Sequence, residues 1–153
     1  MRVRLITVSE RQPEWVNTAY ADYARRLPRH LAPQLIELPL AKRRDDITRA
    51  KADEGQRILD AARDATLVAL DERGKSLTSR ELAGKLPGWE QAGRDLALVI
   101  GGPDGLDASV LAAASFKWSL SALTLPHGMV RVVLAEQLYR AFAINSGHPY
   151  HRD

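Results

Sequence analysis

A glycine-rich turn follows the most apolar short run of the chain, and it is the first place where chemistry could occur. The run Leu96–Ile100 is entirely aliphatic and leads directly into Gly101-Gly102-Pro103-Asp104-Gly105. A short run of this kind is typical of a strand covered on both faces in a parallel sheet. Because glycine has no Cβ and tolerates positive φ, a ligand could lie against the backbone of this turn. A tight strand-to-helix turn without a ligand fits these residues equally well.

Two glycine-containing segments lack the spacing of known nucleotide-binding motifs. Gly74-Lys75-Ser76 ends like a P-loop, but Ala69 stands where that motif needs its first glycine. A dinucleotide site would need Gly-x-Gly-x-x-Gly after the first strand, whereas this chain has Gly-Gly-x-x-Gly after the fourth predicted strand. The Gly101 turn is therefore disfavoured as an NAD site.

The C-terminal tail His148-Pro149-Tyr150-His151-Arg152 concentrates groups that could transfer protons or contact phosphate. We predict no metal site there, because Pro149 breaks any helix that would align the two histidines and no third ligand is near in sequence. The tail is either a frayed chain end or a segment that folds over a site. Cysteine is absent, which excludes disulfides, thiolate metal sites and a cysteine nucleophile. The serine nucleophile motif Gly-x-Ser-x-Gly is absent as well.

The elements that must position these residues alternate between strands and helices. Hydrophobic periodicity and capping residues predict strands at 3–8, 34–38, 66–70, 96–100 and 117–122, and helices at 13–27, 47–62, 78–86, 107–114 and 129–146. Pro87-Gly88 is expected to stop the third helix, and residues 71–76 are expected to form a polar turn. The alternation predicts an α/β fold: one domain over residues 1–153, with an open, mainly parallel sheet and helices on both faces.

Three loops follow strands in this scheme, at 70–72, 101–105 and 120–126. Ligands of open α/β sheets bind outside the carboxyl ends of the strands, so these loops are expected to share one site. The last helix is apolar nearly all round, and a helix without a wide polar face must bury more than one side. It therefore lies inside the monomer or packs partly against a second subunit.

Composition narrows the partners and the compartment. The chain has 153 residues, of which 45% are hydrophobic and 27% charged, as in an ordinary globular domain. Its formal charge of +3 favours a polyanionic partner. Any single basic cluster is equally consistent with an ordinary solvent-exposed surface. No apolar run reaches the ~18 residues of a membrane span, and no secretion signal is visible, so we expect a cytoplasmic protein without membrane contact.

Taken together, the motifs resemble the family of small bacterial SPOUT-class 23S rRNA pseudouridine N3-methyltransferases, nearly end to end. Two features depart from that family: Asp104 stands where it has Glu, and segment 43–48 is shorter than in some members. The resemblance rests on Pro13-Glu14-Trp15, Tyr23, Arg25-Arg26, Leu38-Pro39, Lys42-Arg43, Leu70-Asp71, Gly74-Lys75, Ile100–Gly105, Trp118–His127, Arg131–Tyr139 and His148–Arg152.

The resemblance implies a C-terminal trefoil knot, a homodimer, S-adenosylmethionine as methyl donor and 23S rRNA, on the assembled ribosome, as substrate. It places the cofactor against Leu70, Gly101, Gly102, Leu120, Ser121, Ala122, Leu123, Thr124 and Leu125. His151 is then the first candidate to accept the proton of the base, with Tyr150 and Arg152 holding the RNA. Gly102 is expected to tolerate a side chain least, because a valine there would block the cofactor.

Three other functions stay open at this point. A nucleotide-binding oxidoreductase could use the same strand-end cleft, and a non-catalytic RNA-binding or ribosome-associated module would fit the basic charge. A knotted methyltransferase acting on tRNA is a third alternative, within the same enzyme class. The lack of an appended RNA-binding domain favours a substrate such as a ribosomal particle, since one small domain has little surface for selecting a sequence.

Overall fold

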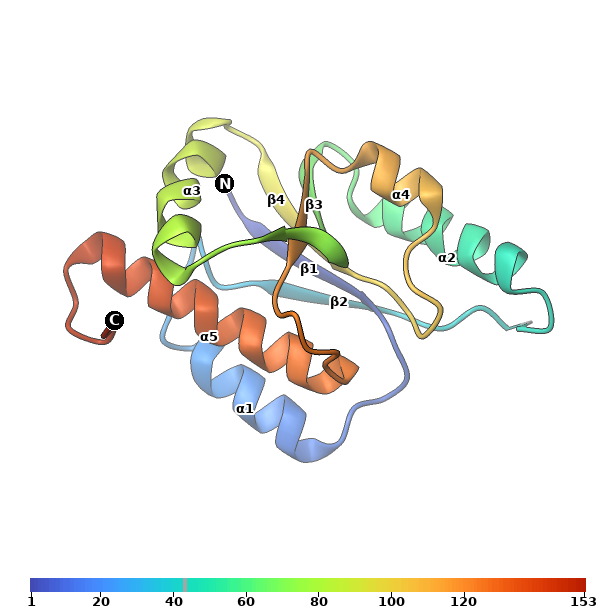
Figure 1. Cartoon of the computed structure of the whole chain (residues 1–153), viewed down its shortest axis with the longest axis horizontal. Coiled ribbons are helices and arrows are strands. Elements are labelled where there is room, and N and C mark those ends of the chain that lie inside the picture. Colours follow the sequence, from blue (N-terminus) through green and yellow to red (C-terminus); the bar gives the residue numbers. More distant parts are fainter. Residues whose placement is uncertain (43) are drawn as a thin grey trace.

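The computed structural model describes residues 1–42 and 44–153, and Figure 1 shows their arrangement. Within that part of the chain, five parallel strands form one sheet in the order β2-β1-β4-β3-β5. The strands are β1 (Val3–Val8), β2 (Gln34–Leu38), β3 (Ala65–Ser76), β4 (Asp95–Ile100) and β5 (Phe116–Ser119). The helices are α1 (Glu14–Ala24), α2 (Ile47–Ala61), α3 (Ser79–Gln91), α4 (Ala108–Ala113) and α5 (His127–Ser146). Arg43, of the Lys42-Arg43 motif, lies outside the described residues.

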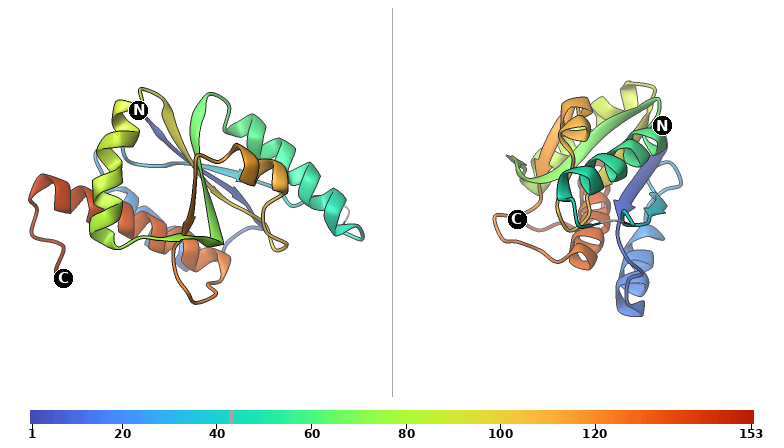
Figure 2. Two further views of the ribbon diagram at one scale, coloured as in Figure 1. Left: turned by 45° about the horizontal axis from the view of Figure 1, so that its top comes forward. Right: turned by 90° about the vertical axis from the view of Figure 1, so that its right-hand side faces the viewer.

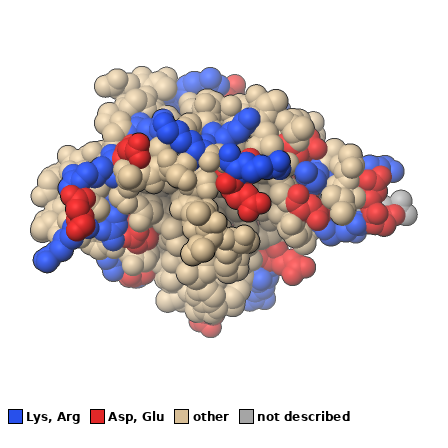
Figure 3. Space-filling model, viewed as in Figure 1, with Lys and Arg blue, Asp and Glu red and all other residues tan. Residues whose placement is uncertain are grey.

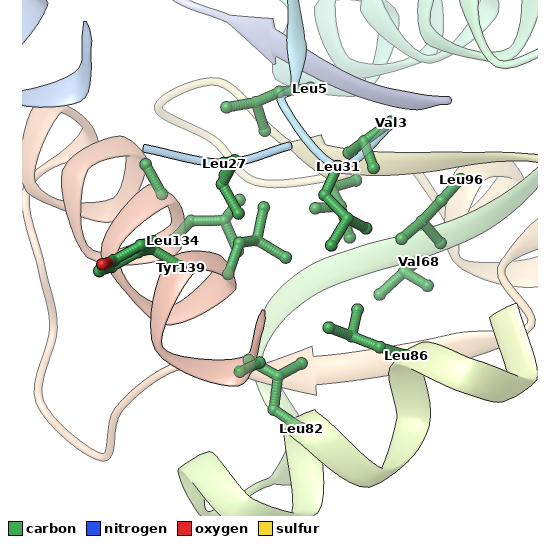
Figure 4. Close-up of a cluster of buried hydrophobic side chains, with 14 of the residues drawn as sticks. Val3, Leu5, Leu27, Leu31, Val68, Leu82, Leu86, Leu96, Leu134 and Tyr139 are labelled. Atoms are coloured by element: carbon green, nitrogen blue, oxygen red, sulfur yellow. The ribbon is translucent and has the colours of Figure 1, made fainter. Parts of the chain in front are cut away.

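Helices cover both faces of the sheet, which confirms the predicted α/β fold (Figure 2). Neighbouring strand residues point to opposite faces, so Leu5 joins one apolar cluster and Ile6 joins the other. The larger cluster packs the sheet against α1, α3 and α5, and Figure 4 shows Leu82, Leu86 and Leu134 within it. The smaller cluster packs against α2 and α4. Burial on both faces explains why β4 is a continuous apolar run from Leu96 to Ile100 rather than an alternating one.

The predicted helix caps are present. The Asp46 side chain accepts a hydrogen bond from Arg49 N–H at 3.2 Å and starts α2. Thr78 and Glu81 form the reciprocal capping box of α3, and Asp107 caps α4 through Ser109 N–H. These local signals agree with the elements that they begin, because each satisfies a backbone N–H that has no partner inside its helix.

The expected stop at Pro87 is wrong, since α3 continues through it to Gln91. Proline has no N–H, so the carbonyl of Ala83 one turn earlier loses its helical donor. The side chain of Asn145, near the end of α5, donates to that carbonyl at 2.9 Å instead. A residue distant in sequence thereby satisfies the group that would otherwise end the helix.

The expected polar turn at 71–76 is also wrong, because β3 runs on to Ser76. Pairing with β5 shifts register between Leu70 and Lys75 and then resumes, with Lys75 opposite Trp118 and Ser76 opposite Ser119. In turn β5 ends at Ser119, three residues before the predicted end at Ala122, so the segment after it is a loop. The last helix starts at His127 rather than Met129 and packs against both α1 and α3, burying more than one side as predicted.

Candidate functional site

The three predicted segments meet and enclose a cleft of about 460 Å³, at the carboxyl ends of β4 and β5 and at the point of β3 where its pairing with β4 ends, after Leu70. This volume lies in the usual range for small-molecule sites. Every residue that the resemblance assigned to the cofactor lines the cleft except Ala122. Those lining residues are Leu70, Gly101, Gly102, Leu120, Ser121, Leu123, Thr124 and Leu125.

Hydrogen bonds between residues two or three positions apart fix the conformations of the two longer loops. In the glycine turn, Gly105 N–H donates to the Gly102 carbonyl at 3.0 Å, and Gly105 has φ +84°, a conformation that favours glycine. In the loop after β5, Ser119 Oγ donates to the Ser121 carbonyl at 3.1 Å, and Ser121 Oγ accepts from Leu123 N–H at 2.9 Å. Leu123 is held with 74% of its surface exposed, at the rim of the cleft.

Gly102 is constrained by packing, which corrects the expected reason for its intolerance of a side chain. A Cβ built on Gly102 would meet Glu54 Oε1 at 3.2 Å, Val8 Cγ1 at 3.3 Å and Leu40 Cδ2 at 3.5 Å. These atoms lie in the protein body beneath the turn. A valine here would press on β1 and α2 before it blocked a ligand.

An ion-pair network that the sequence reasoning missed holds the glycine turn from below. Glu54 of α2 is 2% exposed and accepts from Ala41 N–H at 2.9 Å and from Arg44 Nη1 at 2.5 Å. The other Arg44 nitrogen donates to the carboxylate of Asp104, in the turn itself. The two carboxylates raise the pKa of Arg44, with the hydrogen bond to Glu54 as the largest cause. The only hint of this network in the sequence is Asp104, which stands where the resembling family has Glu.

The cleft combines apolar walls with a charged rim. Leu70, Leu120 and Leu125 supply aliphatic surface, and the charged lining residues are Lys51, Asp71, Glu72, Arg73 and Asp104. Asp104 is paired with Arg44, so the other charged residues balance at two acidic and two basic. Such a lining suits an apolar ring system with polar substituents better than it suits a phosphate.

A buried polar network anchors the first turn of α5, directly after the cleft loop. Arg131 is fully buried and donates to Glu37 at 3.2 Å, to Thr7 and Ser9 hydroxyls at 3.3 Å, and to His127 Nε2 at 3.4 Å. Burial and the Arg131 charge lower the pKa of His127 to about 4, so the ring is neutral at pH 7 and accepts from Arg131. The hydrogen bonds of the buried Arg131 and of His127 thus fix the carboxyl end of the loop from Leu120 to Pro126.

The predicted catalytic tail lies at the other end of α5. Gly147 ends the helix with φ +75°, and the reversed chain packs Tyr150 edge-on against Tyr139, with ring centroids 4.7 Å apart. Tyr150 O–H donates to Glu136 at 3.0 Å, and burial followed by this bond raises the pKa of Tyr150 to about 12. Arg140 stacks on the Tyr150 ring at 4.8 Å.

His151 is fully engaged within its own chain. Its Nδ1 lies 3.1 Å from Arg140 Nη1 and its Nε2 lies 2.7 Å from Asp153 Oδ1. Arg140 can only donate, so Nδ1 is the acceptor and Nε2 carries the proton. Arg152 is exposed. The structure brings Tyr150 and His151 together around Glu136 and Arg140, but not into the cleft of the same chain.

The distance between tail and cleft follows from helix geometry. Val130 lines the cleft, whereas Arg140, which holds His151, comes ten residues later on α5. Ten helical residues span ~15 Å, and Figure 1 shows the C-terminus far from the start of α5.

Among the described residues no cluster of three or more metal-ligating side chains is present. No described helix is long and apolar enough to cross a membrane.

Comparisons with known proteins agree with this fold. A family model described as "Predicted SPOUT methyltransferase" matches residues 1–151. The chain is 51% identical over 156 aligned residues to Ribosomal RNA large subunit methyltransferase H of Thioalkalivibrio sulfidiphilus, covering 100% of both proteins. It is 52% identical over 154 residues to the protein of that name from Alkalilimnicola ehrlichii, covering 99% of both.

Two solved structures share the architecture at low sequence identity. A probable methylase family protein from Haemophilus influenzae superposes with a TM-score of 0.60 at 17% identity, over 97% of this chain and 67% of that one. A probable methyltransferase from Bordetella pertussis gives 0.56 at 18% identity, over 92% and 95%. At such identities the likeness supports the fold alone.

Proposed function

Because the chain belongs to the SPOUT methyltransferase family, we propose that it transfers a methyl group from S-adenosylmethionine to N3 of a pseudouridine in 23S rRNA, on the assembled ribosome. One observation carries the proposal: a cleft at the strand ends is built from the segments that resemble this family. The names of the full-length relatives support rRNA of the large subunit as substrate. With a ribosomal substrate, the protein works in the cytoplasm.

The cleft residues fit S-adenosylmethionine by their chemistry. Leu70, Leu120 and Leu125 offer apolar walls for the adenine, and the fixed loop backbones offer N–H and C=O groups for its edge. Asp71 and Glu72 offer carboxylates to the positive charges of the ligand. When bound, S-adenosylmethionine supplies an electrophilic methyl group on a sulfonium.

The residues of the chain must then orient the base and receive its proton. An imide N–H is a weak nucleophile until it is deprotonated, so a positioned proton acceptor and alignment of N3 with the methyl supply much of the rate. We assign the acceptor to His151, with Tyr150 and Arg152 holding the RNA. The ring nitrogens of His151 face Arg140 and Asp153 in the single chain, so the working site must free one of them.

A homodimer resolves the separation of tail and cleft. Trp15 and Met129 are apolar yet 56% and 37% exposed, and they flank the contact where a Cβ on Gly128 would lie 2.7 Å from Val16 Cγ2. We propose that this end of α1 and α5 packs on a second copy, so that the tail of one chain reaches the cleft of its partner. The last helix completes the proposed trefoil knot within a single domain over residues 1–153.

The dimer is tested by its oligomeric state and by mixing variants. Trp15→Lys with Met129→Lys should give a monomer in sedimentation analysis, whereas Ile47→Lys, a matched change at an apolar residue 55% exposed on α2, should leave the dimer intact. A mixed dimer of a His151→Ala chain and a cleft-blocked chain, Leu120→Trp, should regain up to half of the wild-type activity. A folded Trp15/Met129 double variant that stays dimeric, or mixed dimers without activity, would contradict the arrangement.

The function is tested with purified protein, methyl-labelled S-adenosylmethionine and ribosomes from a strain that lacks the modification. We expect label in N3-methylpseudouridine of 23S rRNA, and calorimetric binding of S-adenosylmethionine but not NAD. Label in tRNA alone would indicate that the protein is instead a methyltransferase acting on tRNA. Ribosome binding without binding of S-adenosylmethionine would instead indicate a non-catalytic module.

A further inference from the structure

The polar end of β3 forms an arm, residues Asp71–Ser76, beside the cleft (green in Figure 1). β4 pairs with β3 only from Ala65 to Leu70, and beyond that point the arm pairs on one side alone, with β5. Its outer edge therefore carries backbone groups and side chains that face solvent. A free polar strand next to a cleft is positioned to meet whatever enters the cleft.

Gly74 fixes the arm at a set position on β5. A Cβ on Gly74 would lie 2.6 Å from the carbonyl carbon and oxygen of Lys117, a distance that real side chains do not tolerate. The arm backbone thus lies directly on the β5 backbone, and only glycine allows this approach. The Asp71 carboxylate accepts from Arg73 N–H at 3.3 Å and shapes the start of the arm.

The outer part of the arm carries two cations, Arg73 and Lys75, whereas its first two residues, Asp71 and Glu72, are acidic. Arg73, Lys75 and Lys117 are exposed, and among the described residues none of them forms an ion pair. Arg73 and Lys75 are two residues apart on a strand, so they project from the same face, ~7 Å apart. Figure 3 shows Lys and Arg side chains gathered over the middle of this face of the molecule. Arg73 also lines the cleft.

We propose that the arm binds the phosphate backbone of the RNA segment next to the target base, through Arg73 and Lys75. The inference rests on the proposed function and names the surface that receives its substrate. Exposed, unpaired cations on a rigid edge suit phosphates because their contact releases condensed counterions without breaking an internal ion pair. Phosphate contacts of this kind set the register of the RNA, so the arm places the base relative to the cleft.

The test compares ribosome methylation by variants of the arm with a matched control. Arg73→Gln with Lys75→Gln should raise KM for ribosomes about tenfold and reduce the slope of log KM against log salt by about 0.7 to 0.9 per lost contact. The dissociation constant for S-adenosylhomocysteine should stay within twofold. Arg63→Gln with Arg94→Gln removes the same charge near the amino ends of β3 and β4, at the other end of the strands, and should leave both the KM and the salt slope unchanged.

Gly74→Ala provides a second test that changes no charge. It forces the arm away from Lys117, so the melting temperature should fall, and at a temperature where circular dichroism shows the variant folded, KM for ribosomes should rise while S-adenosylhomocysteine binding stays near wild type. Equal effects of the arm pair and the control pair would refute the inference, because net charge alone would then explain them. If the wild-type protein methylates no ribosomal RNA, the proposed function itself is wrong. Wild-type activity is therefore measured before the variants are compared.

Discussion

The bond between Asn145 and the Ala83 carbonyl makes a sharp prediction about stability. Pro87 cannot donate to that carbonyl, and the Asn145 side chain donates to it at 2.9 Å. Ala83 is 2% exposed, so Asn145→Ala leaves a carbonyl with little access to water. An unpaired buried group costs about 1–3 kcal/mol, and because Asn145 itself is exposed we expect the lower half of that range. The melting temperature should fall by about 2–6 °C.

The same reasoning predicts that the cost depends on Pro87. In Pro87→Ala the new N–H at position 87 can donate to the Ala83 carbonyl, so Asn145→Ala should then cost less than about 0.5 kcal/mol. Urea unfolding of the four proteins, followed by circular dichroism at one fixed protein concentration, gives the coupling energy, expected near 1 kcal/mol. If the two substitutions prove additive, Asn145 does not replace the missing helical bond and the explanation of the continuous α3 is wrong.

Three further predictions concern the cleft and its anchors. Because the pKa of His127 is about 4 in the folded protein and near 6.5 when unfolded, stability should fall by no more than about 2 kcal/mol as pH drops from 6.5 to 4, and urea titrations of His127→Gln should lose that dependence. Arg44→Gln and Asp104→Asn should each weaken S-adenosylhomocysteine binding about tenfold in calorimetry, while the double variant is no weaker than either; independent effects would refute the network. Gly102→Ala should bind the same ligand within twofold, whereas Gly102→Val should unfold at lower temperature, and a stable Val variant with lost binding would restore the direct block.

The position of the cleft could be predicted from the sequence because it depends on strand order only weakly. Any parallel sheet brings the carboxyl ends of its strands to one side, so locating the apolar strands before Asp71, Gly101 and Leu120 was enough to bring the following segments together. The strand order itself, with β5 beyond β3, carries no local signal and was not predicted.

The errors fall where a distant residue replaces a local partner. Pro87 should stop a helix by every local rule, and the rule fails because Asn145 supplies the missing donor from 62 residues away in sequence. Residues 71–76 have the composition of a turn, yet Gly74 allows β5 to pair with them at backbone contact distance. Neither compensation is visible in a window of neighbouring residues.

The ion pairs beneath the glycine turn were beyond reach for a related reason. Glu54 and Arg44 look like ordinary charges of an amphipathic helix and a basic loop, and only the packing of α2 against β1 and β2 buries the carboxylate. A buried carboxylate needs a positive partner, and Arg44 is then drawn between Glu54 and Asp104. The sequence thus shows that Glu54 and Arg44 are charged, but it does not show that the Glu54 carboxylate is buried.

The arm, the cleft and the tail impose different requirements on one substrate. The cleft has apolar walls and suits a nucleoside, whereas Arg73 and Lys75 of the arm form no ion pair among the described residues and suit a polyanion. On the proposed function, RNA phosphates drawn to Arg73 and Lys75 would be kept at the rim, because Asp71 and Glu72 would repel them from the cleft. The neutral base alone would then enter, beneath the proposed partner tail. Opposite charges separated by a few residues of one strand would in this way sort the two ends of a nucleotide.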